Sequence, residues 1–188
     1  RVSGYYTKFM DQSKVISYYD DVESTFSNFA MSGIDKQHFG LEVAASIPLY
    51  AGLALNGAIS WGQFTYDSNP DYVQIQDNSG EIKNEGKVYW KNFRVESTPQ
   101  TAMNIGLSYR SRNNIYASVD MNYYNNMYLS MSPLYRTDAV LSRNMSAEDI
   151  RELRHQEKFN SACVFNASVG KNWYINRAYT LGFSLEVK

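Results

Sequence analysis

The amino-acid sequence predicts an all-β protein, made of antiparallel strands that cross a membrane as part of a transmembrane β-barrel. Three observations favour this fold class. Apolar and polar side chains alternate along several segments, the connections between these segments are alternately short and long, and aromatic residues lie close to the segment ends. The 188 residues suffice for one domain, and 15% of them are aromatic, including 16 tyrosines, which suits strands that end at a water–lipid boundary.

Alternation is the main signal, because neighbouring side chains of a strand point to opposite faces of the sheet. In residues 53–62, the apolar side chains Leu53, Leu55, Ile59 and Trp61 take odd positions, and small or polar residues separate them. The same period runs through residues 38–47, 103–110, 115–124, 163–170 and 179–187, and it is ambiguous in 2–10. We therefore expect strands at residues 2–18, 24–47, 51–66, 101–110, 115–128, 160–171 and 179–188.

The connections between the predicted strands differ in length at the two ends. Short turns are expected at residues 48–51, 111–114 and 172–178, and long polar connections at 67–98 and 129–159. Because loops beyond about 12–15 residues are uncommon in compact domains, this asymmetry favours a barrel with short periplasmic turns and long extracellular loops. Within the long connections, the sequence predicts a capped helical turn at 146–149 and a turn or small hairpin around 77–80.

Aromatic residues form two groups along the predicted strands. One group lies beside the short turns: Tyr50, Tyr109, Tyr116, Trp173, Tyr174 and Tyr179. The other lies toward the long loops: Phe64, Tyr66, Tyr123, Tyr124 and Tyr128. Two belts separated by about 9–11 strand residues correspond to the aromatic girdles of a membrane barrel, although tyrosine also favours strands in general.

The composition argues against several functions. The formal net charge is −1 without a basic cluster, so no nucleic-acid partner is predicted. The single cysteine, Cys163, falls on the side predicted to face lipid, where it is a small apolar residue. His38 and His155 are far apart in sequence and suggest no hydrolytic triad, so we expect no enzyme, no catalytic residue and no cofactor. Residues 67–71 resemble the start of a calcium loop but have Tyr72 at the position that requires glycine, so no metal site is predicted.

The hydropathy is compatible with a membrane barrel. No segment approaches the run of about 18–20 apolar residues that a membrane-spanning helix needs. The mean hydropathy of −0.46 would ordinarily indicate a soluble protein. A barrel keeps its mean hydropathy low, however, because the side chains that face its lumen are polar.

The strand count indicates that further strands complete the barrel. The predicted strands are odd in number, whereas bacterial single-chain barrels of this kind have an even number. Residues 183–188 stop in mid-pattern without a terminal aromatic residue. Because an open sheet edge cannot face lipid, we expect partner strands outside this sequence.

Several segments resemble late barrel strands and loops of TonB-dependent outer-membrane receptors. The matching patterns are GYYTKFMDQ at 4–12, GIDKQHFGLE at 33–42, MYLS at 127–130, PLYRTD at 133–138, LRHQEKF at 153–159, SVGKNW at 168–173 and GFSLEVK at 182–188. Together, and in this order, they extend over nearly the whole chain. The chain is therefore similar to the C-terminal part of such a receptor barrel.

This resemblance implies that residues 1–188 are a portion of a plugged barrel of about 22 strands in the bacterial outer membrane. It implies uptake of a scarce nutrient (a siderophore, haem, a vitamin or an oligosaccharide) that is driven by the TonB complex. The implied partners are outer-membrane lipid, the plug domain and remaining strands of the parent chain, the nutrient, and TonB, which would be contacted through an N-terminal part outside this sequence.

Two sets of residues are candidates for function. The first set is polar and predicted to face the lumen: Glu42, Arg110, Asp120, Asn122 and Glu186. The second set is predicted to contact ligand: Tyr89, Trp90, Tyr124, Asn126, Tyr128, Tyr135 and Arg136. Aromatic rings stack on sugars or flat chelators, and a guanidinium suits an anionic chelate. A solvated lumen wall is the alternative explanation for the polar strand residues.

Two other functions remain open on the sequence. The chain could be a self-contained small outer-membrane barrel that acts as an adhesin or minor porin, which would require an eighth strand and a terminal aromatic residue. It could also be a soluble lipocalin-like binding barrel with its apolar faces turned inward around a ligand. The long polar loops and the two aromatic groups fit that barrel poorly.

Overall fold

The computed structural model describes residues 1–21, 24–142, 145–176 and 178–188, and these residues form an open antiparallel sheet. The strands are β1 (Val2–Asp20), β2 (Thr25–Pro48), β3 (Leu53–Tyr66), β4 (Asp71–Gln76), β5 (Ile82–Lys87), β6 (Thr101–Arg110), β7 (Ile115–Asn125), β8 (Ala162–Ile175) and β9 (Tyr179–Val187). Three short helices lie between β7 and β8: the 3-10 helix η1 (Pro133–Arg136), α1 (Asp138–Leu141) and α2 (Ala147–Arg154). The predicted all-β, antiparallel fold class is confirmed.

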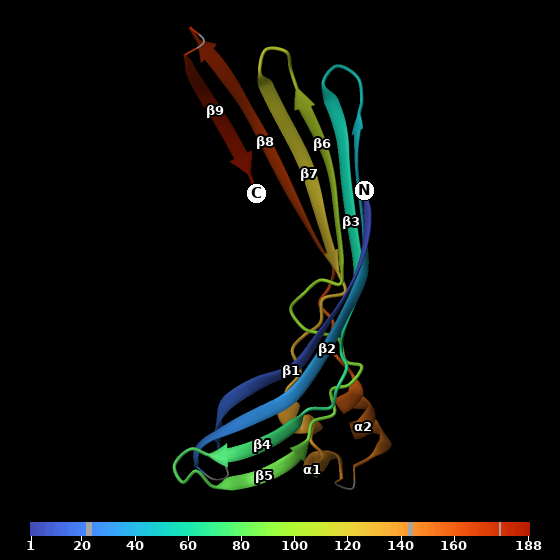
Figure 1. Cartoon of the computed structure of the whole chain (residues 1–188), viewed down its shortest axis with the longest axis vertical. Helices are drawn as coiled ribbons and strands as arrows, with labels where there is room; N and C mark the ends of the chain where they lie inside the picture. Colours follow the sequence, from blue (N-terminus) through green and yellow to red (C-terminus); the bar gives the residue numbers. More distant parts are fainter. Residues whose placement is uncertain (22–23, 143–144, 177) are drawn as a thin grey trace.

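The sheet follows the order of the chain, with one addition. Strands β1, β2, β3, β6, β7, β8 and β9 are neighbours in that order, and the β4–β5 hairpin adds to the N-terminal half of β2 (Figure 1). Among the described residues, β1 pairs with β2 and β9 with β8, and the two edge strands do not pair with each other. The sheet is therefore not closed into a barrel.

The register separates an apolar face from a polar face of the sheet. One row across the strands reads Ile47, Leu55, Leu107, Val119, Ala167 and Val187, each paired with the next. The adjacent row, on the opposite face, reads Ser46, Asn56, Gly106, Asp120 and Asn166. Because a strand alternates its side chains, a register that pairs like with like keeps the two faces distinct from β2 to β9. We call them the apolar face and the polar face.

The described residues leave the apolar face uncovered. Phe165 is 63% exposed, Val119 57% and Leu181 59%. Side chains on the polar face instead bond to one another: Ser46 Oγ donates to Asn56 Oδ1 (2.7 Å), and Asn56 Nδ2 donates to Ser108 Oγ (3.0 Å). The apolar side chains thus lie on the side that makes no contact with the rest of the described chain.

A pair of β-bulges lies halfway along the β1–β2 hairpin and exchanges the faces to which its odd and even side chains point. The register shifts between Phe9 and Gln12 on β1, and the partner strand shifts between Ile34 and Met31. Asp11 and Gly33 have positive φ angles of 54° and 71° there. Because each strand gains one residue, the pairing continues but odd and even positions exchange sides. Phe26 stays exposed on the other side of the outer half of the hairpin, whereas Phe29 and Met31 turn toward the polar-face side.

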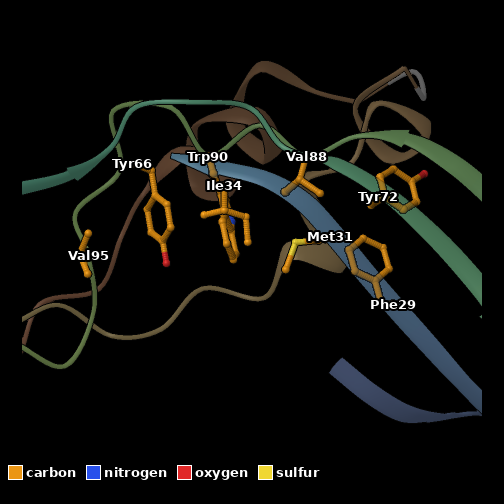
Figure 2. Packing of buried hydrophobic residues seen from close by; sticks show 8 residues of the cluster. All are labelled: Phe29, Met31, Ile34, Tyr66, Tyr72, Val88, Trp90 and Val95. Carbon is orange, nitrogen blue, oxygen red and sulfur yellow. The ribbon is translucent and has the colours of Figure 1, made fainter. Parts of the chain in front are cut away.

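Phe29 and Met31 belong to a hydrophobic core, and we call the part of the molecule around this core the head. The head comprises the outer halves of β1 and β2, the hairpin β4–β5, and the described parts of 88–100 and 129–159. Its buried side chains are Phe29, Met31, Ile34, Tyr66, Tyr72, Val88, Trp90 and Val95 (Figure 2). They project from β2, β3, β4 and the 88–95 segment toward one another. The two long connections are therefore packed structures and not open loops.

Short contacts tie the two long connections together. Val88 forms a β-bridge with Thr137, and the Tyr89 N–H donates to the Arg136 carbonyl (2.8 Å).

Helix α2 begins at a capping box, in which Ser146 Oγ accepts from the Asp149 N–H (3.1 Å) and Asp149 Oδ2 accepts from the Ser146 N–H (3.1 Å). The predicted capped turn at 146–149 is confirmed.

The elements differ from the sequence expectations in three places. The expected small hairpin around 77–80 is real and larger, because β4 and β5 extend it on both sides. The expected turn at 172–178 is wrong in part, because β8 continues to Ile175 and pairs with Tyr179 of β9. The last residues of the expected strand 115–128 leave the regular ladder after Asn125. Among the described residues, the helices are too short and too polar to span a membrane.

Candidate functional site

The five residues predicted to face the lumen all lie on the polar face. Glu42 pairs with Ser60, Arg110 with Tyr116, and Glu186 with Ser168. Asp120 and Asn122 lie on β7, opposite Gly106 and Asn104 of β6. The period-two alternation thus placed these residues on a common face.

Asp120 is the centre of a hydrogen-bonded network on this face. Its Oδ2 accepts from Asn122 Nδ2 (3.1 Å) and from Asn166 Nδ2 (2.9 Å). Asn122 Oδ1 accepts in turn from Asn104 Nδ2 (2.9 Å). One carboxylate that accepts from an amide of its own strand and from an amide of β8 fixes the orientation of both. This arrangement suits a polar wall.

The predicted ligand contacts separate into two places. Tyr124 lies on the polar face of β7, opposite Ala102 and Ala162, beside a shallow groove in the sheet. Asn126 Nδ2 donates to Thr101 Oγ1 (3.0 Å), and Tyr128 bridges to Lys158 where the chain enters the head. These side chains line the approach to the head.

Tyr89, Tyr135 and Arg136 lie in the head itself. Tyr89 is 44% exposed and Tyr135 62% exposed, so both rings are accessible. Trp90 is 2% exposed and its ring packs on Tyr66, with 4.6 Å between ring centroids. Trp90 is therefore a core residue, and its ring has no free surface on which a ligand could stack.

An open hollow of about 880 Å³ brings together Tyr89, Arg136 and residues from other parts of the head. Its lining is Asn69, Tyr89, Lys91, Asn92, Phe93, Arg136, Asp138, Leu141, Ser142 and Leu153. We call it the Arg136 hollow. It combines two cations and one carboxylate with aromatic and aliphatic side chains, and pockets that bind small molecules combine apolar lining with a few polar or charged groups in this way.

Comparison of this chain with protein-family models, curated proteins and solved structures found no match.

The residues of the 67–71 segment have structural roles that explain its acidic composition. Asp67 forms an ion pair with Lys8 (2.9 Å), and Asp71 forms one with Lys87 (2.7 Å). Asn69 Oδ1 accepts from the backbone N–H groups of Trp90 and Lys91 (3.1 and 2.9 Å). The oxygens therefore point in different directions, and the described residues contain no cluster of three or more acidic, His or Cys side chains suited to a metal.

Sequence reasoning predicted Tyr89 and Arg136 of the Arg136 hollow and missed its other described lining residues: Asn69, Lys91, Asn92, Phe93, Asp138, Leu141, Ser142 and Leu153. Lys91 and Phe93 closely follow the predicted aromatic pair at 89–90 and could have been included on that ground. Asn69 reaches the hollow because its Oδ1 accepts from the Trp90 and Lys91 N–H groups, and Asp138 does so because the 88–89 and 136–137 segments pair. That pairing joins residues far apart in sequence, and periodicity carries no information about it.

Proposed function

We propose that this chain is part of the wall and extracellular loops of a TonB-dependent outer-membrane receptor, which takes up a scarce nutrient. The observation that carries the proposal is the division of the sheet into an exposed apolar face and a hydrogen-bonded polar face. Monomeric soluble proteins rarely expose a continuous apolar surface of this kind. Lipid would cover the apolar face, and water or a plug would lie against the polar face.

The dimensions and connections of the sheet support the same proposal. Strands β6 and β7 have 10 and 11 residues, close to the length of about 9–11 residues with which a tilted strand crosses a bilayer. The turns between β2 and β3, β6 and β7, and β8 and β9 are at one end of the sheet, and the head is at the other (Figure 1). Short periplasmic turns and long extracellular connections are the arrangement of outer-membrane barrels.

The head lies on the side of the polar face, which suits ligand capture. Ile34 and Tyr66 belong to the same alternating rows as the polar-face residues Lys36 and Ser60, and both are buried in the head. In a closed barrel the polar face would surround the lumen, so the head would lie over its mouth. A ligand that entered from outside would meet the head before the lumen.

The two open edges of the sheet set a requirement for this function. Backbone groups along β1 and β9 have to be paired inside a membrane, because lipid offers no hydrogen bonds. The proposal therefore includes further strands and a plug from the parent chain, and contact with TonB through that plug-bearing part.

Electrophoresis of the intact parent protein tests the proposal. The protein is extracted from outer membranes in detergent and run with and without boiling. A closed barrel resists unfolding until heated, so we expect the unheated band to migrate differently from the boiled one. A protein that stays soluble without detergent and shows no such shift would contradict the membrane assignment and favour a soluble binding module.

A further inference from the structure

Arg136 presents a half-buried guanidinium whose positive charge is not neutralised by the described part of the chain. Its Nη1 donates to the carbonyl of Ser132 (3.0 Å), and its Cζ lies 5.5 Å from the centroid of the Phe93 ring. Its Nε is buried and has no hydrogen-bond partner. No described carboxylate forms an ion pair with it.

A cation in this position is costly unless it meets an anion. Removal of a charge from water is unfavourable, and burial lowers the pKa of the Arg136 guanidinium for that reason. A guanidinium nonetheless remains protonated in proteins, so the charge stays. A protein can keep such a group when a ligand supplies the missing negative charge.

The position of Arg136 is fixed by the backbone around it. Arg136 ends helix η1, and its carbonyl accepts from the Tyr89 N–H (2.8 Å) while Thr137 bridges to Val88. Thr137 is itself buried. The two backbone segments that carry Arg136 and Tyr89 are therefore held side by side at the Arg136 hollow, which both residues line, without a need for a ligand to order these segments.

The charges around the hollow favour an anion on one side of Arg136. Lys91 lies in the same hollow and adds a second cation. Among the described lining residues, Asp138 is the only acidic one; it hydrogen-bonds with the Tyr72 hydroxyl and accepts from the Ala139 N–H (2.9 Å). The neighbouring hollow on the other side of Arg136 is lined by Asp149, Glu152 and Glu157, which would repel an anion.

We propose that the Arg136 hollow binds an organic carboxylate with an apolar or aromatic body. The planar guanidinium matches the geometry of a carboxylate, and Lys91 adds charge. Tyr89, Phe93 and Leu153 offer apolar surface to the rest of the molecule. The inference deepens the proposed receptor function, on which it rests, by naming the chemical class of the ligand that the head receives.

Calorimetric titration of the intact parent chain in detergent tests this proposal, with benzoate as the probe. Benzamide has the same shape without the charge and is the matched control. We expect benzoate to bind to the parent chain at least about tenfold more tightly than benzamide, as the gain from a charge-assisted hydrogen bond requires. Equal affinity for the two compounds, or no heat of binding for benzoate, would overturn the proposal.

Two variants locate the binding in the hollow. Arg136→Gln should weaken benzoate binding at least about tenfold, and Lys91→Gln, at an exposed position, should weaken it by a smaller factor. Arg112→Gln, which removes an exposed cation from the turn between β6 and β7, should leave the affinity unchanged. If both hollow variants bind benzoate as the parent does, the assignment is wrong, and Lys91→Gln decides the question should Arg136→Gln fail to fold.

This experiment is independent of the test of the proposed function. A chain that shows heat-modifiable migration but no preference for benzoate would keep the receptor proposal and remove the carboxylate. A chain that binds benzoate through Arg136 without heat-modifiable migration would keep the site and remove the barrel.

Discussion

Phe26 and Phe29 show how much the environment of a single residue depends on the parity of its position. Both belong to β2, but Phe29 is 1% exposed in the head core and Phe26 is 58% exposed on the opposite side. The Phe29 ring is stacked on Tyr72 with 4.6 Å between centroids. Three residues of separation place the two rings on opposite faces of the same strand.

We expect Phe29→Ala to destabilise the head by about 3–5 kcal/mol, because it removes a buried ring and leaves a cavity. The measurement is hydrogen exchange of the β4 and 88–95 amides in the detergent-solubilised parent chain, where exchange should become faster. Phe26→Ala is the control and should change exchange little. Equal effects of the two variants would show that the head core does not depend on Phe29.

Ser68 joins the bulged part of β2 to the strand end at Tyr66. Its hydroxyl donates to the Gly33 carbonyl (2.7 Å) and accepts from the Asp35 N–H (2.8 Å). The side chain of Asp35 accepts in turn from the Asp11 N–H (3.0 Å), on the other bulge. One hydroxyl thus satisfies two backbone groups that the bulge removes from the ladder.

Ser68→Ala should cost about 1–3 kcal/mol, because it leaves these part-buried backbone groups unsatisfied. Limited proteolysis of the parent chain in detergent would detect the loss as faster cleavage between β1 and β2. Ser130→Ala, at an exposed serine of the second connection, should have no such effect. A cleavage rate unchanged by Ser68→Ala would mean that the bulges hold without this hydroxyl.

Among the helices, α2 depends most clearly on one side chain. Ser146 hydrogen bonds hold the pKa of the Asp149 carboxyl below its ordinary value of 3.8. A folded-state pKa below the unfolded one means that the cap contributes fully above pH 3.8. The contribution is lost as the pH falls through the lowered folded value.

We therefore expect acidification below pH 3.8 to fray α2, and Asp149→Asn to have a similar effect at neutral pH. Exchange rates of the α2 amides are the measurement. Glu148→Gln, in the same first turn but outside the capping box, is the control. Protection of α2 that is the same in Asp149→Asn as in the unmodified chain would contradict the role of the box.

Period-two alternation is sufficient to predict the regular strands, because a strand with one buried or covered face needs an apolar side chain at every second position. The strands that it predicts at 51–66 and 101–110 are found at Leu53–Tyr66 and Thr101–Arg110 for this reason, and it places Asp120 and Glu42 on the same face. It fails at the bulges, since one inserted residue in each strand reverses the parity without leaving a break in the pattern. It also fails for Trp90, whose burial depends on packing between distant segments.

Because the two faces are separate over the whole sheet, the stability cost of one added charge should depend on the face to which it points. Val119 and Ser118 are adjacent on β7 and point to opposite faces. In the proposed barrel, Val119→Arg would place a guanidinium in lipid, which costs about 2–4 kcal/mol near the bilayer midplane. Ser118→Arg would place it on the polar side and should cost less.

Folding of the parent chain into lipid vesicles, followed by denaturant titration, measures this difference. The expected result is a lower unfolding midpoint for Val119→Arg than for Ser118→Arg. The reverse order would place the apolar face inward, as in a soluble binding barrel. Because the two substitutions are at neighbouring positions, they are matched in strand and depth.

The paired bulges near Asp11 and Gly33 also determine where the apolar band of the molecule ends. Between the bulges and the short turns, the β1–β2 hairpin contributes apolar side chains such as Leu41 and Val43 to the exposed face. On the head side of the bulges, the same hairpin turns Phe29 and Met31 away from that face. In the proposed receptor, two extra residues would thus set the hydrophobic thickness that this part of the wall offers to the bilayer, independently of how long the strands are.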